Sequence, residues 1–230
     1  MEHQEPFLND ILRNTNNQDW LIVSLMVLAT AYIFVRIIYG KYWKRYRQAI
    51  LYGQEAQKLT HEKNVLLLQA AISLNILAMF SMGLFIHSVF IHFTLIDFLP
   101  GNLYGWLLTS LAVILVIGIK YLLNYLLGKS GDNITASTQI NHQWLINLKN
   151  FGFFLLPFTA ASAFTVSPLT EVVLYIGIAV LLFMLIMNYV KGFLVLLQHQ
   201  ISIYYGILYL CTLEILPILI IWKVIRLLMD

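Results

Sequence analysis

The stretch VVLYIGIAVLLFMLIMNY, from Val172 to Tyr189, carries no charged side chain. A helix needs about 20 mostly apolar residues to cross the roughly 30 Å hydrocarbon core of a bilayer, because it rises about 1.5 Å per residue. The stretch therefore predicts a membrane-spanning helix. The whole chain fits this setting, since 60% of its 230 residues are hydrophobic, 11% are charged and the mean hydropathy is +0.79.

Further apolar stretches of similar length lie on both sides of this one. The predicted spans are approximately Trp20 to Gly40, Val65 to Phe90, Leu103 to Leu127, Trp144 to Val166, Val172 to Tyr189 and Tyr204 to Trp222. The connections between them are too short to hold a soluble domain. We therefore expect an all-α integral membrane protein with six transmembrane helices in a bundle, in which residues 20–230 form a single domain.

Positive charge is concentrated in the connection after the first span, which begins KYWKRYR with Lys41, Lys44, Arg45 and Arg47. Connections rich in Lys and Arg stay on the cytoplasmic side of a membrane. This basic loop is therefore predicted to be cytoplasmic. Its cations would also meet anionic lipid headgroups, so the lipid bilayer is the first expected partner.

With six spans and a cytoplasmic basic loop, both termini are predicted to be extracytoplasmic. Residues 1–19 then form an extracytoplasmic N-terminal segment, in which the amide-rich residues 14–19 are expected to make a polar loop. Lys223 and Arg226 disagree with this orientation, because they would lie outside. An odd number of spans would move the C-terminus to the cytoplasm.

The last predicted span contains one acid, Glu214, and one proline, Pro217. If the span starts near Tyr204, Glu214 lies roughly 15 Å deep, near the bilayer centre. A charged acid there costs about 2.5 to 3.5 kcal/mol on insertion scales, so Glu214 should face the bundle interior, pair with a cation or take up a proton. Pro217 cannot donate to the carbonyl of Leu213, so we expect a kink and a freed carbonyl that needs a partner inside the bundle.

An intramembrane polar cluster around Glu214 is the main site hypothesis. Lys120 is its expected counter-charge, because its long side chain could reach toward the depth of Glu214. Asn124, one turn beyond Lys120, and Asn75 in the second span would complete the cluster. Such a cluster fits a structural role that fixes helix register, a proton or ion pathway, or an acid that binds a partner.

Histidine positions do not predict a metal or cofactor site. His87 and His92 are five residues apart, so they are turned by about 140° and do not share a helix face with each other. His61, His142 and His199 lie near the cytoplasmic side, but nothing in their spacing demands a haem or a quinone. The lone cysteine, Cys211, excludes an intramolecular disulfide and a multi-cysteine metal site. We expect no metal and no cofactor.

The stretches NNQDW, Asn16 to Trp20, and LYLCTLEILP, Leu208 to Pro217, resemble a family of uncharacterised multi-spanning inner-membrane proteins of Bacteroidota, known as a domain of unknown function. The resemblance extends over most of the chain. It implies a bacterial inner-membrane location and a terminal helix with a Glu-x-x-Pro motif. It implies no activity.

These observations favour a non-enzymatic accessory or assembly subunit of an envelope membrane complex. The first alternative is a small proton- or ion-coupled transporter that uses Glu214. The second is a membrane enzyme acting on a lipid or isoprenoid carrier, which normally needs several acids or histidines at one interface. Other membrane subunits are the expected protein partners. Nucleic acid is not expected, because the net charge is only +3 and clusters on one side of the membrane.

Overall fold

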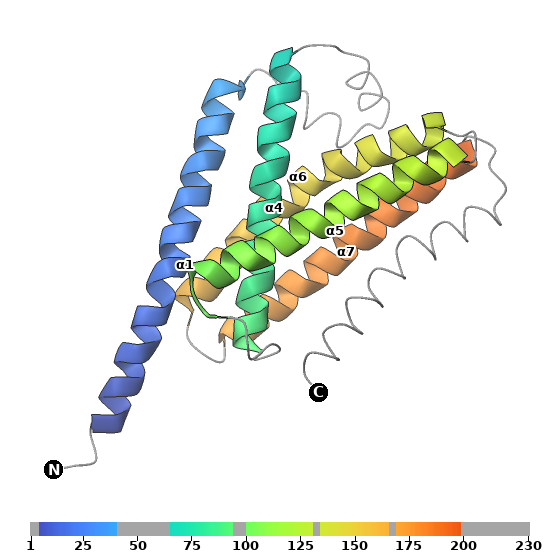
Figure 1. Cartoon of the computed structure of the whole chain (residues 1–230). Helices are drawn as coiled ribbons and strands as arrows, with labels where there is room; N and C mark the ends of the chain where they lie inside the picture. The colour runs from blue at the N-terminus through green and yellow to red at the C-terminus, as the bar shows by residue number, and fades with distance from the viewer. Residues whose placement is uncertain (1–4, 41–64, 94–99, 131–133, 166–168, 199–230) are drawn as a thin grey trace.

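The computed structural model describes residues 5–40, 65–93, 100–130, 134–165 and 169–198. Regular structure in these ranges is α-helical throughout, which confirms the all-α expectation for the described part of the chain. The helices are α1 (Glu5–Ile38), α4 (Val65–His92), α5 (Leu103–Ser130), α6 (Ile134–Phe164) and α7 (Leu169–Gln198) (Figure 1).

Two groups of helices cross each other. Figure 1 shows α1 and α4 side by side, with α5, α6 and α7 running together across them and each helix reversing the direction of the one before. The central helices are α4, which packs against α1, α5 and α6, and α6, which packs against α1, α4, α5 and α7. The largest buried apolar cluster accordingly joins the two groups, and it consists of Ala78, Met82, Phe85, Ile117, Leu148, Phe151, Leu155 and Leu174.

Four of the described helices are long and apolar enough to cross a membrane. These segments are Asp19–Ile38, Leu68–His92, Leu103–Leu126 and Leu169–Val195, and they coincide with the first, second, third and fifth predicted spans. The protein is therefore a multi-pass membrane protein by helix length and hydropathy. The fourth predicted span lies within α6, which is not among these four, and the sixth, residues 204–222, lies outside the described residues.

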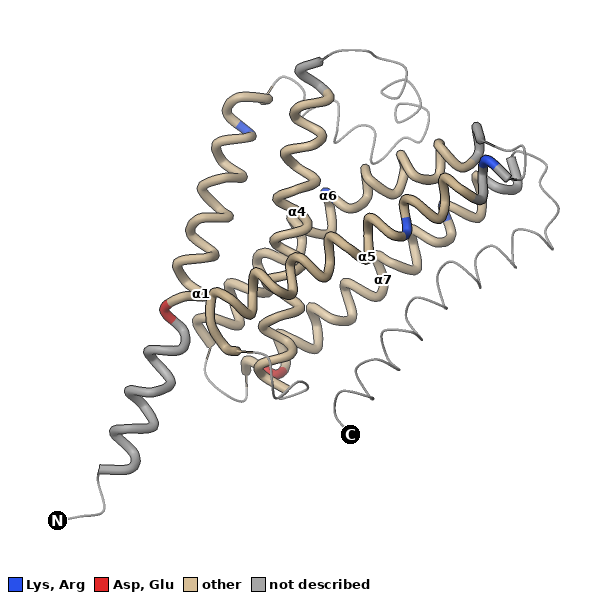
Figure 2. The backbone as a smooth tube through the Cα atoms, in the orientation of Figure 1, with Lys and Arg blue, Asp and Glu red and all other residues tan. Residues whose placement is uncertain are grey.

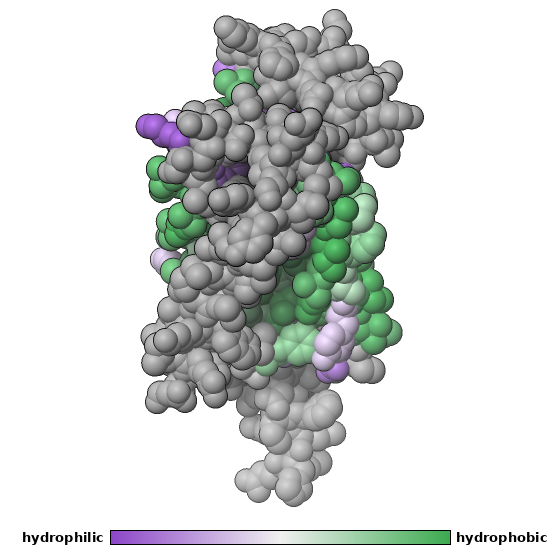
Figure 3. All heavy atoms as spheres, turned by 90° about the vertical axis from the view of Figure 1, so that its right-hand side faces the viewer, coloured by the Kyte–Doolittle hydropathy of each residue, from purple (hydrophilic) through white to green (hydrophobic). Residues whose placement is uncertain are grey.

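The lower hydropathy of α6 follows from its central position. A helix that packs against protein on most sides can carry polar groups that a lipid-facing helix cannot. Buried polar side chains on α6 are Ser137, Asn141, Asn147, Thr159 and Ser162. By contrast, α5 and α7 expose large apolar side chains along much of their length. The described surface visible in Figure 3 is mostly hydrophobic, as expected for helices that meet acyl chains.

The polar loop expected at residues 14–19 is wrong, because α1 continues without interruption from Glu5 to Ile38. No glycine or proline occurs between Phe7 and Ile38. Asparagine and aspartate lower helix propensity by only a few tenths of a kcal/mol each, which is too little to break a helix that is continued by an apolar span. The membrane-compatible part of α1 begins at Asp19, within the helix.

Charged residues of the described helices separate toward opposite ends of the bundle (Figure 2). Arg36 lies in the last turn of α1 and Lys129 in the last turn of α5, whereas Glu171 lies in the first turn of α7. Because successive helices reverse direction, the two cations lie at one end and the acid at the other. We call the end that contains Arg36 and Lys129 the cationic end. Such an asymmetry is the pattern that the positive-inside rule describes.

Small residues bring the helix backbones into close contact where the two groups cross. A Cβ atom added to Gly152 of α6 would lie 2.6 Å from the Cβ of Ala78 on α4 and 2.9 Å from the Tyr32 hydroxyl. A Cβ atom added to Gly83 of α4 would lie 2.7 Å from the Cα of Ser110 on α5. All three distances are too short for a Cβ atom, so glycine is required at both positions. This is the packing expected in lipid, where close approach and van der Waals contact replace the hydrophobic drive.

We predict that Gly152→Ala destabilises the bundle by about 1 to 3 kcal/mol, the usual penalty for inserting a methyl group into a packed interface. Gly118→Ala is the matched control, since Gly118 is also helical and has no neighbouring atom within 4 Å of an added Cβ. The free energy of unfolding of each purified variant is measured by titration with SDS in mixed detergent micelles, with circular dichroism as the signal. Equal stability of the two variants would contradict the packing at Gly152.

Candidate functional site

A lysine enclosed by two aromatic rings lies where α5, α6 and α7 meet. The Nζ atom of Lys120 on α5 is 5.0 Å from the ring centroid of Trp144 on α6 and 5.1 Å from that of Tyr189 on α7. A cation over an aromatic face contributes about 0.5 to 1 kcal/mol when exposed and about 2 when desolvated. The half-buried Lys120 side chain therefore links α5 to both α6 and α7 through its contacts with the two rings.

An amide pair joins α5 to α6 one helical turn beyond Lys120. The Nδ2 atom of Asn124 donates to Oδ1 of Asn141 at 2.8 Å, and both side chains are buried. Asn141 in turn donates to the carbonyl of Tyr121 at 3.4 Å, and the Ser137 hydroxyl donates to the carbonyl of Asn124. Because the two amides bond each other, and because Asn141 and Ser137 also donate to backbone carbonyls of α5, α5 and α6 can bury these polar groups without a large desolvation penalty.

A second amide pair joins α6 to α7. The Nδ2 atom of Asn147 donates to Oδ1 of Asn188 at 2.6 Å. Asn147 is 8% exposed and Asn188 is 5% exposed. The Nδ2 atom of Asn188 is also buried, and it has no hydrogen-bond partner among the residues that the structure describes. A buried donor without an acceptor costs about 1 to 3 kcal/mol, so this amide marks a place where an acceptor would be stabilising.

A pocket of about 190 Å³ opens between α6 and α7 beside this second pair. We call it the α6–α7 pocket, and its lining residues are Asn147, Asn150, Phe151, Phe154, Phe183, Met184, Met187, Asn188 and Lys191. Its walls are aromatic and methionine side chains, while its polar groups are amides and one ammonium. The pocket thus offers hydrogen-bond donors and positive charge within an apolar surround, which suits a carboxylate or phosphate attached to an apolar body.

The electrostatic environment of this region is positive. Lys120, Lys149 and Lys191 all belong to it, whereas the carboxylates Asp19 and Glu171 of the described spans lie at the starts of α1's span and of α7. Burial, and next the charge of Lys149, lower the pKa of His142 below its ordinary value. His142 is therefore neutral near pH 7, and the positive charge of the region comes from its lysines.

Part of the predicted polar cluster occurs in this region. Lys120 and Asn124 both face α6, as neighbours along one side of α5. Asn75 lies on α4, where its Oδ1 atom is buried and has no hydrogen-bond partner within the described ranges. Glu214 and Pro217 lie outside the described residues, so the predicted pairing of Glu214 with Lys120 stays a prediction. The basic loop with Lys41, Lys44, Arg45 and Arg47 also lies outside them.

Asn141, Asn147 and Asn188 were not among the predicted site residues. Two of them could have been found from the sequence, since Asn147 and Asn188 are uncharged polar residues inside the predicted spans Trp144 to Val166 and Val172 to Tyr189. A search of the predicted spans for asparagine and glutamine would have found both residues. Their pairing could not be derived, because it depends on how α6 and α7 are rotated against each other.

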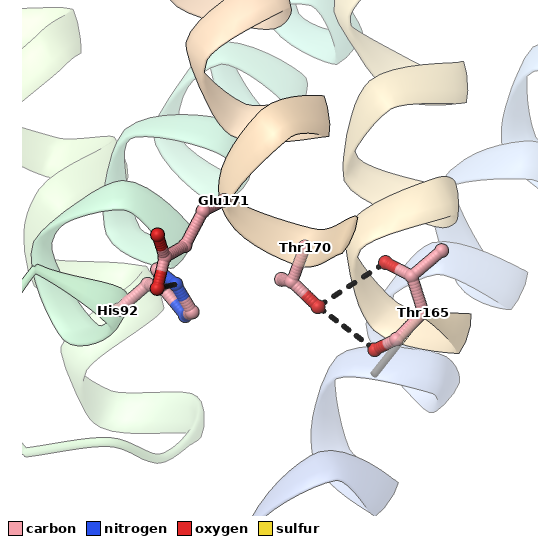
Figure 4. A network of polar contacts seen from close by, with 4 residues as sticks. All are labelled: His92, Thr165, Thr170 and Glu171. Atoms are coloured by element: carbon pink, nitrogen blue, oxygen red, sulfur yellow. Dashed lines mark hydrogen bonds and ion pairs between the residues drawn. The ribbon is translucent and has the colours of Figure 1, made fainter. Parts of the chain in front are cut away.

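The opposite end of the bundle contains a smaller set of polar contacts (Figure 4). His92, the last residue of α4, lies 4.0 Å from Glu171 in the first turn of α7. The Thr170 hydroxyl donates to the carbonyl of Thr165 at 2.9 Å and joins the two helices across the tight connection from α6 to α7. His87 differs from His92, because its ring is fully buried and meets the edge of Trp20 at 5.2 Å.

These contacts close helix ends and form no metal-binding arrangement. The ion pair between His92 and Glu171 is partly solvated, so its contribution to stability is small. Within the described ranges, no group of three or more His, Cys, Asp or Glu side chains is placed to hold a metal ion. The candidate site of the molecule is therefore the polar region between α5, α6 and α7.

A family model described as a domain of unknown function, DUF4271, matches residues 21–225. Because the match covers most of the chain, the protein belongs to this family. No curated protein and no solved structure matches the chain. Family membership confirms the resemblance to a domain of unknown function, and the family description assigns no activity to its members.

We predict that the Asn124–Asn141 hydrogen bond stabilises the bundle as a pair. A double-mutant cycle of Asn124→Ala and Asn141→Ala should show a coupling of about 0.6 kcal/mol, and at most about 1.7, the range for interhelical hydrogen bonds in a membrane protein. The matched control is the cycle of Asn124→Ala with Asn147→Ala, which should be additive because Asn147 bonds Asn188 instead. SDS-induced unfolding supplies the free energies. A coupling as large in the control cycle as in the test cycle would contradict the pairing.

Proposed function

We propose that the protein is a non-enzymatic accessory or assembly subunit of a larger complex in the inner membrane of a bacterial envelope. In this proposal residues 204–222 form a sixth span, α6 crosses the membrane as the fourth, and the cationic end of the bundle faces the cytoplasm. Both termini are then extracytoplasmic. Two observations support a bacterial inner membrane. The NNQDW and LYLCTLEILP motifs resemble those of bacterial inner-membrane proteins, and the charges of the bundle are distributed asymmetrically between its two ends.

The observation that carries this proposal is that many buried polar side chains of the described helices form hydrogen bonds or ring contacts with other groups of the bundle. The buried hydroxyls of Ser24, Ser81, Ser88 and Thr159 each bond the carbonyl four residues earlier on their own helix. The paired asparagines bond across helix interfaces, and Lys120 is enclosed by aromatic rings. The hydroxyls are thus satisfied within their own helices, and the asparagine pairs and Lys120 join one helix to the next. A subunit whose task is to present a fixed helical surface needs this kind of rigidity.

The distribution of acids argues in the same direction. A proton or ion pathway through a membrane usually includes ionisable groups at intermediate depth. In the described spans, Asp19 and Glu171 are the carboxylates, and both lie at span ends. Glu214 alone remains as a proposed mid-membrane acid, and one acid supports a relay poorly. A lipid-modifying enzyme would need several acids or histidines at one interface, and the described helices place His87, His92 and His142 in separate surroundings.

We predict that the full-length protein, extracted from its native membrane in a mild detergent, co-purifies with at least one other membrane protein at fixed stoichiometry. The reason is that a subunit keeps its partner when the partner interface is buried apolar surface. Affinity purification followed by size-exclusion chromatography and quantitative mass spectrometry measures the stoichiometry. An unrelated multi-pass protein with the same tag, purified in parallel, controls for carry-over.

The transporter alternative predicts a different result. A protein that purifies alone, and whose reconstituted vesicles move protons or a solute in a manner abolished by Glu214→Gln, would overturn the subunit proposal. A stable partner together with inactive vesicles supports it. The Gln variant keeps the shape of the side chain but cannot titrate, so loss of transport would identify the acid as a titrating group.

A further inference from the structure

The α6–α7 pocket contains an unfinished polar site, which begins with the amide of Asn188. This side chain is 5% exposed, accepts a hydrogen bond from Asn147 through Oδ1, and leaves its Nδ2 donor buried without an acceptor. Lys191, one turn further along α7, adds an ammonium to the same pocket. An acceptor that carries negative charge would satisfy the amide and meet the ammonium together.

The rest of the lining defines what kind of body carries this acceptor. Phe154, Phe183, Met184 and Met187 make an apolar wall of rings and flexible thioethers. Methionine adapts its shape to a packed neighbour, and aromatic rings bury a large area against it. The pocket therefore fits a mostly apolar element with one anionic group at a set position along it. A span that contains a single acid has this composition.

The length of chain beyond α7 places such an acid at the depth of the pocket. The last residue of α7 is Gln198, and the next predicted span starts at Tyr204, so residue 201 is the middle of the connection. Two antiparallel helices joined by a short connection bring residues equally distant from its middle to the same level. Asn188 and Glu214 are equally distant from residue 201. A shift of one residue in the connection changes the level by only about 1.5 Å.

We propose that the α6–α7 pocket is the docking site for the C-terminal span of this same chain, with the Glu214 carboxylate accepting from Nδ2 of Asn188 and facing the ammonium of Lys191. The docked acid then meets its desolvation cost through a charge-assisted hydrogen bond and an opposite charge. The proposal assigns Glu214 two partners, Asn188 and Lys191, which both lie on α7. It differs from the pairing with Lys120, which lies beside Tyr189 on the α5 side of α7.

The first test measures on which side of α7 the segment lies. In full-length protein with Cys211→Ser, we expect Met187→Cys with Glu214→Cys to form an intramolecular disulfide on mild oxidation in membranes, because a disulfide needs Cβ atoms about 3.5 to 4.5 Å apart. The matched control is Ile186→Cys with Glu214→Cys. Ile186 is exposed, neighbours Met187 at nearly the same depth, and is turned by about 100° away from it around the helix.

The expected outcome is a several-fold higher disulfide yield for the pair with residue 187 than for the pair with residue 186. A higher yield from residue 186 would place the segment on the α5 side and overturn the proposal. Low yields from both pairs, together with a phospholipid that co-purifies with the protein and is lost in Lys191→Met, would also overturn it. In that case the pocket is a site for an anionic lipid headgroup.

The second test keeps the acid in place and measures its partner. Glu214→Gln and Lys191→Met should each lower the melting temperature in detergent, and the double variant should lose no more than the worse single variant. Glu214→Gln combined with Lys120→Met should instead lose the sum of the two single effects. The proposal would be contradicted if the changes in melting temperature were additive for Glu214→Gln with Lys191→Met and non-additive for Glu214→Gln with Lys120→Met. Disulfide yield and melting temperature report contacts within one chain, whereas the subunit proposal, on which the docking of the C-terminal span does not depend, is tested by co-purification. Either proposal can therefore be contradicted while the other stands.

Discussion

Polar groups in a hydrocarbon environment must find partners within the protein, and this constraint organises the bundle. Hydrogen bonds between helices satisfy it at two levels, through Asn124 with Asn141 and through Asn147 with Asn188. The enclosed ammonium of Lys120 satisfies it at a third point. These contacts fix the rotation of α5, α6 and α7 about their axes, because an amide turned toward lipid would lose its partner. Close contacts at glycine and alanine then set how near the helices approach α4.

The same constraint explains how α6 can be less apolar than the four segments that are apolar enough to cross a membrane. Its neighbours on α1, α4, α5 and α7 shield it from lipid, so it can carry the amides and hydroxyls that bind those neighbours. The exposed helices α5 and α7 show apolar side chains outward and keep their polar residues on the inner side. Positive charge gathers at one end of the bundle, and the α6–α7 pocket opens in this region with one buried donor, Nδ2 of Asn188, that has no acceptor among the described residues. This arrangement fits the proposed docking of the C-terminal span, because a rigid bundle with an anion-accepting pocket can bind a helix that carries an acid.

Much of the fold could be predicted from the sequence, because uninterrupted apolar length is a strong signal in a membrane protein. Four predicted spans coincide with helices of the required length and hydropathy. The continuity of α1 through residues 14–19 was missed, since asparagine-rich residues suggest a loop although they tolerate a helix. Within the candidate site, Lys120 and Asn124 were predicted as polar residues inside a span. Their aromatic and amide partners were not, because helix rotation and crossing are set by tertiary contacts that no periodicity encodes.

If Glu214 docks in the α6–α7 pocket as proposed, its carboxyl group lies within hydrogen-bond distance of the Asn188 amide. Solid-state NMR on full-length protein in bilayers, labelled with ¹³C at glutamate carboxyls and ¹⁵N at asparagine side chains, measures it most directly. We expect a short-range dipolar coupling between a glutamate carboxyl carbon and an asparagine side-chain nitrogen, which disappears in Asn188→Leu and in Glu214→Gln. A glutamate carboxyl coupling that survives Asn188→Leu, or the absence of any such coupling in the unmodified protein, would contradict the proposed docking.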